Sequence, residues 1–149
     1  MLFRSRPSAA FRFFTGLTEL AEAMVHAGRI TEALALVETG IEQSEGGWLT
    51  PELLRLKGEL FRLQRTPAVA ERAEDLFRQA LDGAHRQKAL SWELRAAMSL
   101  ARLLRHRRYP ADAIACLQPI YDRFTEGFGT ADLIAAKQLL DELSDAGRR

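Results

Sequence analysis

Residues 71–84, "ERAEDLFRQALDGA", match two other stretches of this chain that stand forty residues away on either side. These are "TEALALVETGIEQS" at 31–44 and "ADAIACLQPIYDRF" at 111–124. In each, an alanine is followed by small or apolar residues three, four and seven places later, a spacing that follows one face of an α-helix. Each stretch therefore predicts an amphipathic helix. The aligned positions are Ala33, Leu36, Val37 and Gly40; Ala73, Leu76, Phe77 and Ala80; and Ala113, Cys116, Leu117 and Ile120.

A second helical pattern precedes each of these stretches, so that the chain contains three predicted helical hairpins. Its members are Leu17, Leu20, Ala21 and Met24; Leu54, Gly58 and Phe61; and Ala97, Leu100, Ala101 and Leu104. A single hairpin cannot bury its apolar face alone, so successive hairpins are expected to stack. The small residues Ala21, Gly58 and Ala101 are expected where helices cross closely.

Turn and capping residues predict where the helices begin and end. Gly28 follows the first helix, and the second hairpin loop, around "RTP" at 65–67, is expected to be three residues longer than the first. Thr50 and Thr66 each precede a proline, so both are expected to be N-caps with proline in the first helical turn. Thr130 predicts the start of a seventh helix.

These patterns predict an all-α fold of about seven helices in one domain, residues 1–149. The expected bounds are about 14–46, 51–87 and 91–125 for the three hairpins, and about 130–144 for a C-terminal capping helix.

The repeated positions resemble those of tetratricopeptide repeats (TPR), whose signature places Trp, Leu, Gly, Tyr, Ala, Phe and Pro in a 34-residue unit. The second unit carries the resemblance through Leu54, Lys57, Gly58, Phe61, Ala73 and Phe77. The signature Trp and the closing Pro are missing, and the period here is forty. The resemblance covers residues 14–124 and implies a right-handed superhelical stack of three TPR-like hairpins with the capping helix at its end.

A narrower resemblance concerns "PELLRLKGELFRL", "AEDLFRQALDGAHRQKALSWELRAAMSLARLL" and "FTEGFGTADLIAAKQLLDEL". Together these are similar to the C-terminal repeat arm of bacterial signalling proteins that join a nucleotide-cyclase or transcription-activator domain to a P-loop ATPase. The resemblance implies a docking or sensor arm. No G-x-x-x-x-G-K-[ST] motif is present, so nucleotide binding through a P-loop is not expected. A detached arm and a stand-alone repeat protein both remain open.

The composition favours a cytoplasmic globular protein. Of the residues, 47% are hydrophobic and 28% charged, and the formal net charge is +1, so any electrostatic recognition must be local. One cysteine excludes an internal disulfide. Neither a secretory signal nor an apolar run of about 18 residues is present, so no membrane association is expected.

The sequence predicts no enzyme and no cofactor. His26, His85 and His106 fall near the ends of different helices without a partner at metal-ligand spacing. Cys116 occupies an apolar repeat position and has no histidine on its helix to act as a base, which favours a packing role.

The TPR resemblance implies that the first helix of each hairpin lines a concave peptide-binding groove. The residues expected there are Glu22, His26, Arg55, Glu59, Arg62, Arg95, Met98, Arg102 and Arg105. Arginine forks could pair with carboxylates of an acidic or C-terminal peptide segment, and Met98 could provide adaptable apolar contact. A face that is only solvated is the alternative. Asparagine is absent from the chain, which excludes the lysine and asparagine clamp of chaperone-binding TPR proteins.

Two other functions remain open from the sequence. The basic stretch 102–109 suggests nucleic-acid binding, although the low net charge and the lack of interleaved aromatics disfavour it. The second of these functions is self-association, because the N-terminal end of the stack has no evident capping helix. The residues expected to form a homodimer there are Phe3, Phe11, Phe13 and Phe14. Trp48 and Trp92 are expected to pack between layers or, if exposed, to mark a docking edge.

Overall fold

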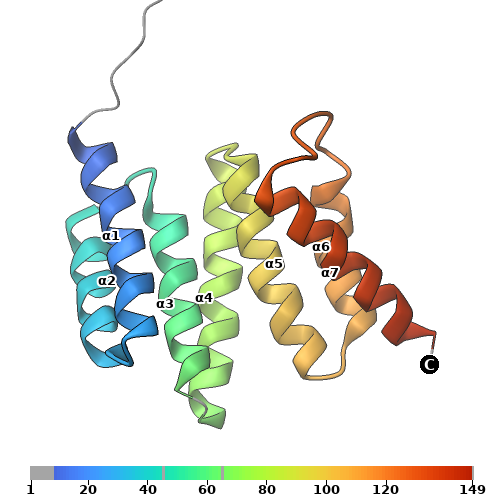
Figure 1. Cartoon of the computed structure of the whole chain (residues 1–149), viewed down its shortest axis with the longest axis horizontal. Coiled ribbons are helices and arrows are strands. Elements are labelled where there is room, and N and C mark those ends of the chain that lie inside the picture. The colour runs from blue at the N-terminus through green and yellow to red at the C-terminus, as the bar shows by residue number, and fades with distance from the viewer. Residues whose placement is uncertain (1–8, 45, 65, 149) are drawn as a thin grey trace, which may run out of the picture.

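The computed structural model describes residues 9–44, 46–64 and 66–148, and over these ranges it contains helices and no strand (Figure 1). The seven helices are α1 (Ala9–His26), α2 (Ile30–Ser44), α3 (Thr50–Leu63), α4 (Pro67–Arg86), α5 (Leu90–His106), α6 (Pro110–Tyr121) and α7 (Ala131–Gly147). The all-α prediction is confirmed. In the described part of the chain no helix is both long and apolar enough to span a membrane.

Each helix packs against the next one in the chain, and Figure 1 shows them following one another from α1 at one end to α7 at the other. The odd-numbered helices also contact one another in succession: α1 with α3, α3 with α5, and α5 with α7. Within the described residues, α2, α4 and α6 make no such contacts among themselves. The odd-numbered helices therefore form one close row, and each even-numbered helix contacts members of this row.

Small residues occupy the closest crossings. Ala33, Ala73 and Ala113 are each fully buried. A Cβ added at Gly58 would lie 2.5 Å from the ring of Phe77, which is itself 0% exposed. A Cβ at Gly40 would lie 2.6 Å from a methyl group of Leu17 on α1. At such small positions, therefore, the backbone of one helix contacts a side chain of the neighbouring helix.

The three extra residues of the second hairpin do not lie in its loop, so that prediction is wrong. The helices of each hairpin are separated by three residues, at 27–29, 64–66 and 107–109. The extra residues lengthen α4, which has 20 residues against 15 in α2. Pro67 lies in the first turn of α4, and its fixed φ suits a helix. Because of this, α4 begins directly after Thr66.

The caps differ in detail from those expected. Thr66 and Thr130 are N-caps with extended backbone, but neither side chain makes a capping hydrogen bond. The N-cap of α3 is Leu49 and not Thr50, which is the first helical residue. The Thr50 hydroxyl hydrogen-bonds instead to the Ser44 hydroxyl at 2.9 Å, and this contact joins α3 to the end of α2.

Helices α1, α4 and α5 end in the same way, with a residue at positive φ. These residues are Gly28 (φ 75°), Lys88 (φ 56°) and Arg108 (φ 67°). In each case the next backbone N–H reaches back to a carbonyl five residues earlier, as in the hydrogen bond from Tyr109 to Leu104 at 2.9 Å. Glycine adopts this conformation without steric cost, whereas Lys88 and Arg108 do not.

Of the residues expected to form an N-terminal dimer contact, Phe3 and the side chains of Phe11, Phe13 and Phe14 lie outside what the structure describes. Dimerisation through that end stays a prediction.

Replacing Gly58 by alanine is expected to destabilise the protein even though alanine favours helices. The helix-propensity gain of about 1 kcal/mol is smaller than the cost of overpacking against the immobile Phe77 ring, about 1–3 kcal/mol. Denaturant unfolding followed by circular dichroism measures the change. Gly16→Ala is the control, because a Cβ there meets nothing within 4 Å; it should stabilise, and a stabilising Gly58→Ala would contradict the close packing.

Arg108→Gly is expected to raise the free energy of unfolding by about 0.5–1 kcal/mol, because it removes the steric cost of positive φ at the end of α5. Arg108→Ala removes the same side-chain charge but keeps the Cβ, so it should give no such gain. Equal effects of the two variants in thermal unfolding would show that charge, and not backbone conformation, limits stability here.

Candidate functional site

The predicted site residues lie on the odd-numbered helices. Helical spacing places Glu22 and His26 on one face of α1. In the same way, Arg55, Glu59 and Arg62 share one face of α3. Arg95, Arg102 and Arg105 form the corresponding stripe of α5. We call the side of the molecule formed by these eight residues, with Asp132 and Glu142 of α7, the odd-helix face.

Polar contacts set the register between α3 and α5. Arg95 Nη1 lies 2.8 Å from Glu52 Oε1, and Arg55 Nη1 donates to Ser99 Oγ at 3.4 Å. The two helices therefore run in the same direction, and successive residues of α3 lie beside successive residues of α5. Further along, Arg62 and His106 line one pocket, which continues this register.

The contacts between α5 and α7 follow a similar register. Arg95 Nε lies 3.9 Å from Asp132 Oδ2 near the starts of the two helices. Arg105 and Glu142 form an ion pair nearer their ends. Side chains on the odd-helix face therefore link α3 to α5 and α5 to α7.

The link between α3 and α5 is buried. Glu52 is 4% exposed, Arg55 8% and Ser99 1%. Arg55 forms a two-bond pair with Glu52, with Nε–Oε2 at 2.9 Å and Nη2–Oε1 at 2.8 Å. Burial opposes the charge of Arg55, but the hydrogen bonds and charge of Glu52, together with the charges of Glu59 and Glu22, raise the pKa of Arg55 above its ordinary value. Arg55 thus stabilises the helix pair instead of reaching out as expected.

Met98 does not offer the apolar contact predicted for it. It is 3% exposed and belongs to the apolar core that extends from α3 to α7. The reason is the position of α5, which packs against α3, α4, α6 and α7 and keeps only a narrow exposed stripe. Ser99, which contacts Arg55, was missed by the sequence reasoning because a serine in an apolar stripe carries no signal of its partner.

Arg102 differs from the other arginines of the odd-helix face. It is half-buried, and within the described residues no hydrogen bond or ion pair is formed by its guanidinium. Burial lowers the pKa of Arg102 below its ordinary value, against the opposing charge of Glu59. The charges of Arg55, Arg62 and Arg105 lower this pKa further. Arg102 is therefore a partly desolvated cation among like charges.

The neighbouring arginines already have carboxylate partners. Arg62 Nε lies 3.0 Å from Glu59 Oε2, and Arg105 pairs with Glu142. Both of these ion pairs are exposed to solvent, so each holds its two side chains only weakly. An incoming carboxylate could exchange with them at little cost.

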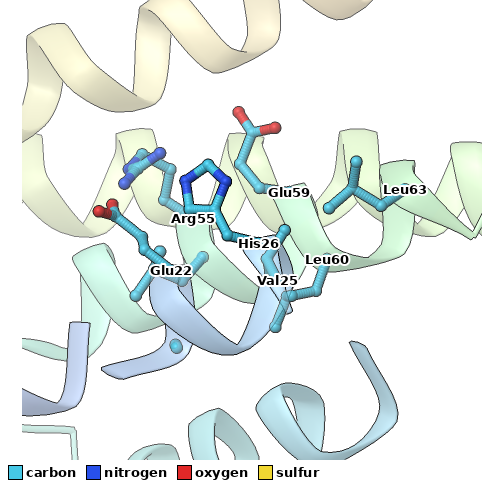
Figure 2. Close-up of a pocket in the computed structure, with 9 residues that line it drawn as sticks. Glu22, Val25, His26, Arg55, Glu59, Leu60 and Leu63 are labelled. Carbon is cyan, nitrogen blue, oxygen red and sulfur yellow. The ribbon is translucent and has the colours of Figure 1, made fainter. Parts of the chain in front are cut away.

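A pocket of about 140 Å³ opens between α1 and α3 on the same face (Figure 2). Its lining consists of Ala21, Glu22, Val25, His26, Arg55, Leu56, Glu59, Leu60 and Leu63. Four of the predicted site residues therefore meet here, around an apolar wall that sequence reasoning had not assigned to the site. Ala21, Leu56 and Leu60 belong to the buried core between these helices, and Leu63 is 40% exposed.

Two of the four arginines of the basic stretch 102–109 have carboxylate partners within the described chain. Arg105 pairs with Glu142, and Arg107 pairs with Glu74 of α4. These internal partners reduce the charge that a nucleic-acid backbone would meet.

The other candidate residues have local packing roles. Cys116 is half-buried, and burial raises the pKa of its thiol against the opposing charge of Arg78, which disfavours the reactive thiolate. His85 Nδ1 lies 3.0 Å from Glu93 Oε1. Among the described residues no cluster of three or more His, Cys, Asp or Glu side chains is arranged to hold a metal ion.

Trp48 and Trp92 stack on each other, with ring centroids 5.1 Å apart and planes inclined by 16°. The pair connects the loop before α3 to the first turn of α5, as the packing alternative predicts. Trp48 nevertheless remains 45% exposed.

Comparisons of this chain with models of known protein families, with curated proteins and with solved structures found no match. The TPR resemblance therefore stays a prediction.

Glu52→Gln is expected to lower the free energy of unfolding by about 3 kcal/mol, because it leaves the buried Arg55 without a counter-charge. Chemical denaturation measures the loss. Glu32→Gln breaks an exposed pair with Arg29 at the same spacing and is the matched control; it should have little effect. Similar stability of the two variants would contradict a structural role for the buried pair.

Proposed function

We propose that this chain is a non-catalytic protein–protein interaction module that binds an acidic segment of a partner protein on its odd-helix face. The hairpins would form a TPR-like, right-handed superhelical stack with this face on the concave side. The resemblance to repeat arms extends the proposal to a docking or sensor role in a bacterial, cytoplasmic signalling system.

The helix contacts support a curved arrangement. Among the described residues, odd-numbered helices contact one another along the row, whereas even-numbered helices do not. A stack that is close on one side and spread on the other curves toward the close side. Concave repeat surfaces of this kind bind extended segments of partners.

The observation that carries the proposal is Arg102. Within the described residues, the half-buried guanidinium of Arg102 makes no hydrogen bond or ion pair, and the charge of Glu59 near it is opposed by those of Arg55, Arg62 and Arg105, so a further anion that approaches it is stabilising. A carboxylate can accept two parallel hydrogen bonds from a guanidinium. The exposed pairs of Arg62 and Arg105 can then rearrange around the same ligand.

A protein partner is favoured over nucleic acid because the available positive charge is local. Glu52, Glu59 and Glu142 neutralise most of the arginines of the face and would repel a continuous phosphate backbone. A short acidic segment needs only the position at Arg102.

The proposal predicts that a deca-glutamate peptide binds at α3 and α5, and that Arg102→Gln weakens this binding roughly tenfold, as expected for the loss of one charge-assisted contact. Two-dimensional NMR titration locates and quantifies the binding. Arg86→Gln is the control, since Arg86 is an exposed arginine of α4 that pairs with Asp82. Equal losses in both variants, or shifts confined to the even-numbered helices, would refute the odd-helix face as the docking surface.

A further inference from the structure

We infer that the bound segment carries an apolar side chain two residues from its acidic residue, the apolar side chain filling the pocket between α1 and α3 and the acidic one reaching Arg102. This inference rests on the proposed function and specifies the partner's recognition motif.

The pocket suits one aliphatic side chain. Its volume of about 140 Å³ is below the roughly 300–1,000 Å³ of pockets that enclose small-molecule ligands. The apolar lining residues are Ala21, Val25, Leu56, Leu60 and Leu63. Leu63 is 40% exposed in spite of its size, so a ligand that covers it removes apolar surface from water.

The charged residues around the pocket determine where the apolar and the acidic residue of the bound segment lie. Glu22 and Glu59 are in its lining, and Figure 2 shows the Glu22 carboxylate near Arg55 and the Glu59 carboxylate on the other side of His26. These carboxylates repel an acidic residue placed directly over the pocket. Arg102 lies on the next helix of the row, so charge complementarity places the acidic residue on the α5 side and the apolar residue on the α1 side.

The spacing follows from the distance between packed helices. Neighbouring helix axes lie about 8–10 Å apart, which is also the step from the groove between α1 and α3 to the groove between α3 and α5. An extended peptide advances about 3.3 Å per residue and presents every second side chain on the same side. An advance of two peptide residues covers most of the distance between the two grooves. The long side chains of Arg102 and of a glutamate cover the rest.

Three end-capped heptapeptides of equal composition test the motif: GGLGEGG, GGEGLGG and LGGGGGE. At least one of the first two is expected to bind roughly fivefold more tightly than the third in NMR titrations, with shifts at α1, α3 and α5. Both orientations are included because the charges set the position of the two side chains and not the direction of the chain. Equal binding of all three peptides would overturn the inference.

Two pocket variants separate this inference from the proposed function. Leu63→Gln should weaken the preferred heptapeptide roughly fivefold and leave deca-glutamate binding unchanged. Leu20→Gln is the matched control, since Leu20 is 47% exposed on α1 but does not line the pocket. If Leu63→Gln has no effect while Arg102→Gln abolishes deca-glutamate binding, the motif is wrong and the docking function stands. If Arg102→Gln changes neither ligand, both are wrong.

Discussion

The architecture depends on close approach between neighbouring helices at positions that have no side chain or only a methyl group. Gly58 lies against the buried ring of Phe77, and Gly40 against Leu17, at distances that a Cβ would violate. Ala73 of α4, in the same hairpin as Gly58, is also fully buried. Because each hairpin can bury its apolar face only against the next, these contacts hold the row of helices together and bring their polar stripes side by side.

The polar stripes then act as a second set of contacts across the same row. Glu52 holds Arg55 and Arg95 between α3 and α5, and its burial makes the pair costly to break. The apolar seams bring these helices together, and the buried ions specify one register between them. A shift of a single residue along either helix would break the contacts of Arg95 with Glu52 and of Arg55 with Ser99.

The candidate binding surface follows from how these charges are shared. Four arginines of the odd-helix face have carboxylate partners within the described chain, and Arg102 does not. The pairing that stabilises the row therefore leaves Arg102 of this face without an ion pair among the described residues. The buried part of the odd-helix face stabilises the fold, and the proposed function assigns ligand binding to its exposed part.

The sequence by itself determined the helices, their pairing into hairpins and the small positions of the core, because helical periodicity and chain breaks are local properties. It also placed Arg102 on the same stripe of α5 as Arg95 and Arg105. Only the tertiary structure decided that Met98 and Arg55 are buried, that the extra residues lengthen α4, and which carboxylate each arginine meets. Burial and ion pairing depend on groups that are far apart in the chain, and a pattern within one helix carries no information about the residues packed against it.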